Sequence, residues 1–165
     1  MTQAHLTDTN WSIHRDSRPL SLPLDERIAG GRGFWLIGRL LIGGLFLVSG
    51  AEKLMGLDQF AVMLVKNGIP DDVAAVLAPV AAAAETAGGF CIAVGLATSW
   101  ASLLMIVFTV TAAFVSHRFW EFDGAMAQTQ QAHFLKNVMI VGAFCLLYVS
   151  GGGPCSIDRW WRDRQ

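Results

Sequence analysis

Four long apolar runs are the feature that most limits how this chain can fold. They cover residues 34–51, 73–96, 100–116 and 134–150. A helix needs about 20 residues, within a range of about 17–25, to cross the hydrocarbon core of a bilayer. Inside the bilayer each run must be helical, because unpaired backbone polar groups are not tolerated there. The sequence therefore predicts an all-α, polytopic membrane protein built as a four-transmembrane-helix bundle.

The amino-acid composition supports the same fold class. Hydrophobic residues make up 53% of the chain and charged residues only 15%, whereas an ordinary soluble domain has about 25% charged residues. The lipid bilayer is the expected partner. The net charge is −1 without a basic stripe, so we expect no nucleic-acid partner. Three widely spaced cysteines without a CxxC motif argue against a disulfide framework, a metal site or dithiol redox chemistry.

Basic residues near the ends of the runs predict the orientation in the membrane. Lys and Arg favour the cytoplasmic side, and they gather before the first run and after the fourth. We therefore expect both the N and the C terminus in the cytoplasm. Residues 1–33 are expected to form a largely irregular tail, because no apolar core marks them as a signal peptide. Residues 34–151 then form the transmembrane domain, and 152–165 form a basic cytoplasmic segment.

Glu85 is the charged residue deep within the second run. It lies 12 residues past the start of that run, or about 18 Å along a helix, which is close to the bilayer midplane. An ionised carboxylate there costs about 2.5–3.5 kcal/mol. Arg39 is the nearest cation by depth, so we expect an Arg39–Glu85 ion pair inside the bundle. Small residues on the faces that carry these two charges predict close packing of the first two runs.

Several polar residues lie where the runs reach the predicted outer side of the membrane. Lys53 ends the first run, His117 ends the third, and Lys136 and Asn137 begin the fourth. One interpretation is a set of boundary residues whose long side chains reach the headgroup layer. The other is a pocket into which all four side chains turn, with Glu85 beneath them.

The order and spacing of these residues resemble the DoxX family of small four-helix membrane proteins. The matching stretches are RLLIGGLFLVSGAEKLMGLDQF, AETAGGFCIAVGLAT, VSHRFW, HFLKNVMIVGAF and GGGPCSID. The resemblance implies a multi-pass protein of the bacterial cytoplasmic (inner) membrane. It also implies a link to redox chemistry, since relatives in the wider group take part in thiosulfate:quinone oxidoreduction or serve as membrane partners of redox enzymes.

Two functions stay open on this basis. In the first, the protein is a membrane subunit of a quinone-linked oxidoreductase system and binds a quinone, which needs hydrogen-bond donors and a protonatable group nearby. His117 and Glu85 are then the proton carriers. Lys53, Lys136 and Asn137 are then the donors to the quinone head group. In the second, the protein is a non-catalytic accessory or anchoring subunit of a larger membrane or redox complex, and its internal ion pair is a structural lock.

Overall fold

The computed structural model describes residues 24–165, and residues 1–23 lie outside the described part of the chain. Four helices are long and apolar enough to cross a membrane, which confirms the expected four-helix membrane bundle. The spanning helices are α1 (Leu24–Met55), α3 (Asp71–Val94), α4 (Thr98–Ser116) and α5 (Gly124–Ser150). The side of the membrane that the termini face stays a prediction.

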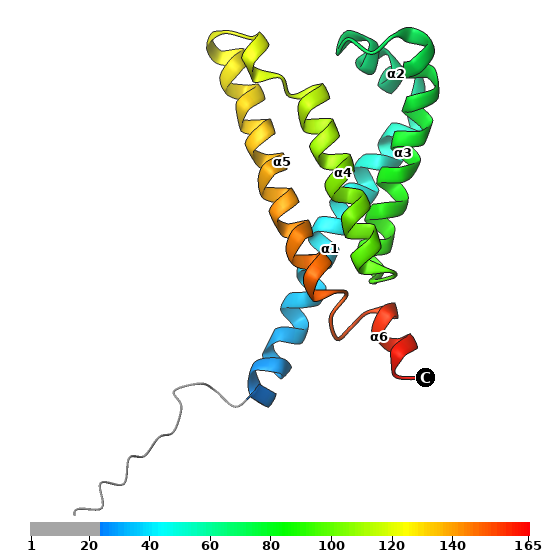
Figure 1. Ribbon diagram of the computed structural model, residues 1–165, viewed down its shortest axis with the longest axis vertical. Helices are drawn as coiled ribbons and strands as arrows, with labels where there is room; N and C mark the ends of the chain where they lie inside the picture. The colour runs from blue at the N-terminus through cyan, green and yellow to red at the C-terminus, as the bar shows by residue number, and fades with distance from the viewer. Residues whose placement is uncertain (1–23) are drawn as a thin grey trace, which may run out of the picture.

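Three short helices lie at the ends of the spanning helices. They are α2 (Leu57–Lys66), the 3₁₀ helix η1 (Phe119–Glu121) and α6 (Ile157–Arg162). Figure 1 places α2 and η1 at one end of the bundle and α6 at the other, where α1 also begins. The structure therefore has helices in three segments for which the sequence predicted only connections or a basic tail.

The first spanning helix begins earlier than its apolar run. It starts at Leu24, so residues 24–33 are helical, and the expectation of an irregular segment up to residue 33 is wrong for them. The physical reason is that Pro23 is the last proline before Pro70, and nothing after Pro23 breaks the helix. The helix of the fourth run is also longer than the run itself. It begins at Gly124, and its first turns are polar.

Helices α1 and α3 pack backbone against backbone. A Cβ atom added to Gly43 would lie 2.5 Å from the backbone nitrogen of Ala93, and one added to Gly89 would lie 2.5 Å from that of Leu47. The expected close approach of the first two runs is therefore observed, because glycine leaves room for it. The contact uses Gly89 on α3, whereas the neighbouring Gly88 of the expected small-residue face packs against Met105 of α4.

Helix α2 folds back onto the first half of α3. Phe60 and Leu64 of α2 form a buried cluster with three alanines of α3, Ala74, Ala78 and Ala82. The alanines lie four residues apart and so share one helix face. This packing covers the part of α3 that extends past the end of α1.

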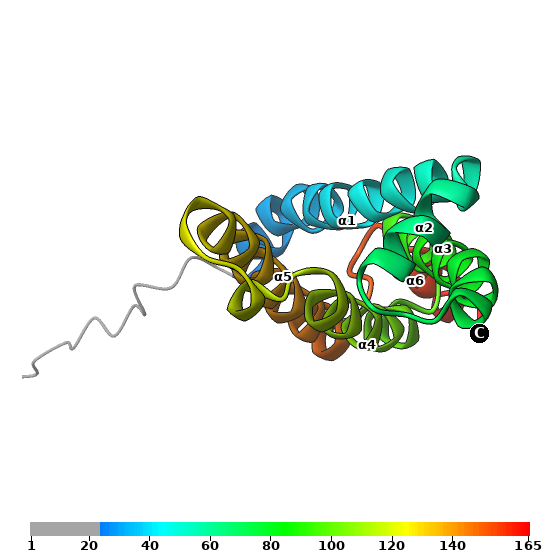
Figure 2. The same cartoon turned by 90° about the horizontal axis from the view of Figure 1, so that it is seen from above.

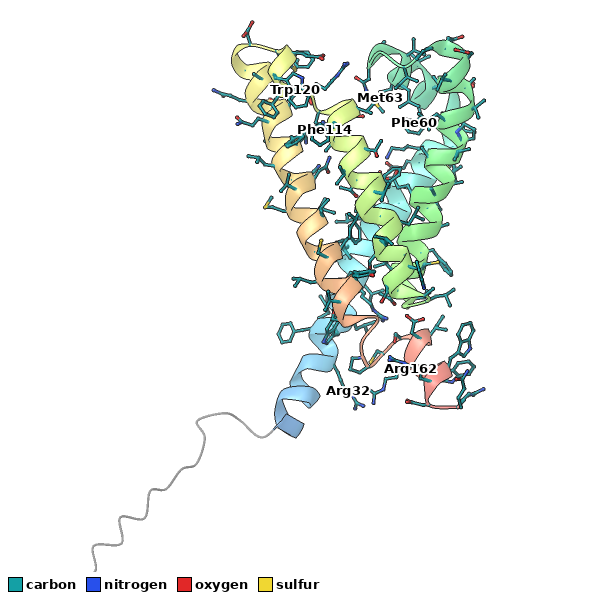
Figure 3. All side chains as sticks on the ribbon, viewed as in Figure 1. Arg32, Phe60, Met63, Phe114, Trp120 and Arg162 are labelled. Atoms are coloured by element: carbon teal, nitrogen blue, oxygen red, sulfur yellow. The ribbon has the colours of Figure 1, made fainter. Side chains whose placement is uncertain are left out.

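The remaining helices close the bundle at the α6 end and diverge toward the other end. Ile92 of α3, Met105 of α4 and Phe144 of α5 belong to one buried cluster, and the rings of Phe46 and Phe144 lie 5.4 Å apart. Figures 1 and 2 show that α5 stands away from α2 and α3 where these helices reach the α2 end. The side chains of that end, including Phe60, Phe114 and Trp120, are labelled in Figure 3.

Candidate functional site

Glu85 lies buried between α1 and α3 and binds Lys53. The distance between Lys53 Nζ and Glu85 Oε2 is 2.6 Å. The same ammonium donates to the hydroxyl of Ser49, one turn earlier on α1, at 3.0 Å. It also lies 5.6 Å from the centre of the Phe60 ring. The Lys53–Glu85 pair therefore joins α1, α2 and α3 at one point.

The two side chains of this pair differ in exposure. The Glu85 side chain is 3% exposed and the Lys53 side chain is 28% exposed, so Lys53 keeps part of its side chain at the surface and Glu85 does not. A lysine ammonium has three N–H donors. Glu85 and Ser49 accept two of them, which leaves one N–H of Lys53 for a further acceptor.

The expected Arg39–Glu85 ion pair is wrong. Glu85 pairs with Lys53 instead, because the contact of Gly43 with Gly89 fixes how far the antiparallel helices α1 and α3 are displaced along each other. Arg39 precedes this contact on α1 and lies beside the last turn of α3. Lys53 follows the contact and reaches Glu85. Counting residues along each run gives the depth of each charge in its own helix. It does not give the displacement of α1 along α3, so it could not predict this pairing.

Arg39 is buried against the end of α3, and its Nε and Nη1 atoms have no hydrogen-bond partner within residues 24–165. Its side chain is 1% exposed, its Nη2 donates to the carbonyl of Cys155, and its Nη1 packs against Gly95, where an added Cβ would overlap it. Gly95 directly follows α3, and the carboxyl end of a helix carries partial negative charge that favours a cation. Within residues 24–165 no carboxylate forms an ion pair with Arg39, so the helix end and one carbonyl are its partners.

Asp158 binds the beginning of α4 close to this arginine. Its carboxylate accepts from the backbone N–H groups of Ala97 at 2.6 Å and Thr98 at 2.8 Å, and from the Thr98 hydroxyl at 2.7 Å. Burial by itself raises the pKa of Asp158, but the hydrogen bonds from Thr98 and Ala97 and the charge of Arg162 outweigh it and lower the pKa overall. The C-terminal segment thus places an acid at the positive end of α4.

The polar residues expected around a single pocket form separate groups. His117 Nδ1 lies 3.0 Å from Gln130 Oε1, and the His117 ring stacks on His133 with centroids 5.1 Å apart. Lys136 is exposed on α5. In the described part of the chain, neither His117 nor Lys136 is hydrogen-bonded to Lys53. That part also holds no group of three or more metal-ligating side chains.

Asn137 belongs to a small pocket between α4 and α5. The pocket has a volume of about 90 Å³ and also contains Thr109, two phenylalanines and several aliphatic side chains. The Thr109 hydroxyl is buried and has no hydrogen-bond partner within residues 24–165. The lining is otherwise apolar, and Asn137 and Thr109 are its two polar residues.

Sequence reasoning missed two residues that position Lys53. Ser49 had a local signal, because it lies four residues before Lys53 and therefore on the same helix face. Phe60 had none, since its contact with Lys53 depends on α2 folding back over α3. The site is thus built from one local contact and two contacts that only the tertiary fold creates.

Comparison with known proteins places these residues in a family. The family model for DoxX matches residues 34–118. Inner membrane protein YphA of Escherichia coli (strain K12) is 32% identical over 124 residues, which cover 75% of this chain and 87% of YphA. Inner membrane protein YqjF of the same organism is 31% identical over 124 residues, covering 75% of this chain and 88% of YqjF. No solved structure gives a significant match.

Proposed function

Because the chain belongs to the DoxX family, we propose that this multi-pass inner membrane protein is a membrane subunit of a quinone-linked oxidoreductase system. The Lys53–Glu85 pair is the site that meets the quinone. The observation that carries this proposal is the unequal exposure of the two side chains, 28% for Lys53 and 3% for Glu85. A quinone head group arriving from the membrane can reach the ammonium, while the carboxylate stays shielded behind it.

The residues around Lys53 fit a quinone carbonyl. The N–H of Lys53 that neither Glu85 nor Ser49 accepts can donate to a carbonyl oxygen. The positive charge of Lys53 stabilises negative charge on that oxygen, and this effect is larger in a water-poor site. The Phe60 ring, 5.6 Å from Nζ, shields one side of the ammonium from water. A bound quinone would accept two electrons and two protons when it is reduced.

Glu85 provides the proton-holding group of this site. Its Oε2 lies 2.6 Å from Lys53 Nζ, within the range over which a proton passes directly between a base and an acid. Glu85 is ionised in this pair, so it can pass a proton to Lys53 only after taking one up itself; otherwise the proton that Lys53 gives to the reduced head group is replaced from water. The electrons come from a partner protein or a small reductant, and His117, Lys136 and Asn137 have no part in the hydrogen bonds of this pair.

Quinone binding in mild detergent tests the proposal. We expect the purified protein to bind a short-chain ubiquinone, measured by isothermal titration calorimetry, and Lys53→Met to weaken binding at least about tenfold, since one charge-assisted hydrogen bond is worth about 1.5–3 kcal/mol. Lys136→Met is the matched control and should leave the affinity unchanged. Lys53→Gln removes the charge but keeps a hydrogen-bond donor, and it serves if the methionine variant does not fold.

Two results would contradict the proposal. One is the absence of quinone binding by the folded wild-type protein. The other is equal affinity in the wild type and in folded Lys53 variants. A loss of quinone binding in Lys136→Met would indicate that the head group binds near Lys136 of α5 and not near Lys53.

A non-catalytic accessory or anchoring subunit is the second candidate. The observation that favours it is the separation of His117 and Lys136 from the Lys53–Glu85 pair, which leaves the pair joining α1 to α3 as an internal lock. This function predicts that a protein partner co-purifies in a fixed ratio and that no quinone is bound. Mass analysis of the complex isolated from its native membrane separates the two functions.

A further inference from the structure

A second cavity lies at the opposite end of the bundle, where the C-terminal segment meets the end of α3. Its volume is about 400 Å³, and its lining includes Val94 of α3 together with Cys155, Ile157, Arg159 and Trp160 of the C-terminal segment. This size falls within the usual range of about 300–1,000 Å³ for small-molecule sites. The Lys53–Glu85 pair takes no part in it.

The surface around this cavity is rich in arginine. Arg159, Arg162 and Arg164 are all exposed. The nearby acids are already engaged, because Asp158 binds the start of α4 and Asp163 lies 3.5 Å from Arg159. Asp163 also lines the cavity beside Arg159, so the charges of the lining balance, and the additional positive charge comes from Arg162 and Arg164 on the surrounding surface.

Aromatic side chains place the cavity at the level of lipid headgroups. Trp160 and Trp161 are 51% and 54% exposed, and indoles favour the boundary between membrane and water. Figure 3 shows Arg162 of α6 at the same end of the molecule as Arg32 of α1. Val94 ends a spanning helix, so the cavity lies where the apolar part of α3 ends and the exposed arginines of α6 begin.

We infer that this cavity binds the headgroup of an anionic phospholipid. The planar guanidinium of Arg159 matches the geometry of a phosphate group, and Arg162 and Arg164 add attraction for a second negative charge or a net negative lipid. Val94 and Ile157 lie where the glycerol and the first methylene groups of the lipid pass. This inference does not depend on the proposed function.

Lipid retention is the first test. The protein is purified from mixed phosphatidylglycerol and phosphatidylcholine, and the lipids that stay bound are counted by native mass spectrometry. We expect phosphatidylglycerol to be retained preferentially, and Arg159→Gln with Arg162→Gln to reduce its retention about fivefold for each arginine removed. Lys66→Gln with Lys136→Gln removes the same charge from the other end and should have no effect.

The reactivity of Cys155 is the second test, because Cys155 is exposed and lines the cavity. In a Cys91→Ala, Cys145→Ala background, N-ethylmaleimide should label Cys155 more slowly in nanodiscs with phosphatidylglycerol than in phosphatidylcholine alone. Arg159→Gln should restore the faster rate in the same anionic nanodiscs. A general effect of surface potential would slow both proteins equally.

Three outcomes overturn the inference. The first is equal retention of phosphatidylglycerol by the wild type and the double arginine variant. The second is slow labelling that persists in Arg159→Gln. The third is protection of Cys155 by soluble inorganic phosphate in phosphatidylcholine nanodiscs as strong as that by the anionic lipid, which would make the site one for free phosphate.

Discussion

Arg39 and Glu85 are both buried between the helices of this protein, but they have different kinds of partner. Arg39 meets a backbone carbonyl and the end of a helix, neither of which can take up or release a proton. Glu85 meets the charged side chain of Lys53 at 2.6 Å. A guanidinium presents a rigid, planar set of donors, whereas the lysine ammonium is a compact charge on a flexible stem. The contacts of Arg39 therefore depend on the fold of the backbone, and the Lys53–Glu85 contact depends on two side chains that can be substituted independently.

Breaking the Lys53–Glu85 pair should have the largest effect. Removal of one partner of a buried ion pair costs about 3–5 kcal/mol because it strands the other charge. We expect Lys53→Met to lower the free energy of unfolding more than Glu85→Gln does, since Glu85 is 3% exposed and Lys53, at 28%, can reach water. The double variant should recover most of the loss. Unfolding in mixed micelles measures all three.

A double-mutant cycle between Arg39 and Glu85 sharpens the comparison. Arg39→Met and Glu85→Gln should have additive effects on the free energy of unfolding, because these two side chains do not touch. Recovery of stability in the Arg39→Met, Glu85→Gln double variant would support the ion pair first expected from the sequence. Additive losses for Lys53→Met and Glu85→Gln would contradict the pair that the structure contains.

The next largest effect on stability is expected at the glycine contact between α1 and α3. Gly89→Ala places a Cβ 2.5 Å from a backbone nitrogen of α1, so α1 and α3 must separate, at a cost typical of overpacking, about 1–3 kcal/mol. Gly44→Ala is the matched control, since nothing lies within 4 Å of its added Cβ and alanine favours a helix by about 1 kcal/mol. Thermal unfolding compares them. Equal effects of the two substitutions would mean that this contact does not set the displacement of the helices.

The smallest effect is expected at Asp158 and depends on pH. Its pKa is lower in the folded protein than the usual value, which is about 3.9, so its contribution to stability is fully present above about pH 4 and is lost as pH falls through the folded pKa. Asp158→Asn should cost about 0.5–1.5 kcal/mol at neutral pH, because the charge and one of the two accepting oxygens are lost. Below pH 4 the melting temperatures of the wild type and the variant should converge. A constant difference across this range would show that the charge of Asp158 is not involved.

Much of the fold could be predicted because each spanning helix is specified by its own residues. The four apolar runs each satisfy the length and composition of a membrane span, and these are local properties. Helix α2 was missed because its burial of Phe60 and Leu64 only makes sense once α3 lies beside it. The early start of α1 was missed because apolar length, rather than the position of Pro23, was used to set its boundary.

The candidate site was harder to predict because it depends on how helices are placed against one another. The sequence identified Glu85 and Lys53 as charges that need an explanation, and the structure brings them together. The sequence also identified Arg39, but the partners of Arg39 are a carbonyl and a helix end. Every residue has the same backbone groups, so the sequence does not indicate which of them will contact an arginine. Residues at a similar depth, such as His117 and Lys136, were expected to converge, yet equal depth does not determine which way a side chain points.

The contact between Arg39 and Cys155 also sets an order in time for the assembly of the protein. The two residues are 116 positions apart, and a ribosome that adds about 5–20 residues per second makes the carbonyl of Cys155 roughly 6–23 seconds after Arg39. By the end of that interval all four spanning helices have been synthesised, and until then the guanidinium lacks this carbonyl as a partner. A chain that stops before Cys155 never acquires this carbonyl, so Arg39 in a truncated protein lacks the one hydrogen bond that its side chain makes within residues 24–165.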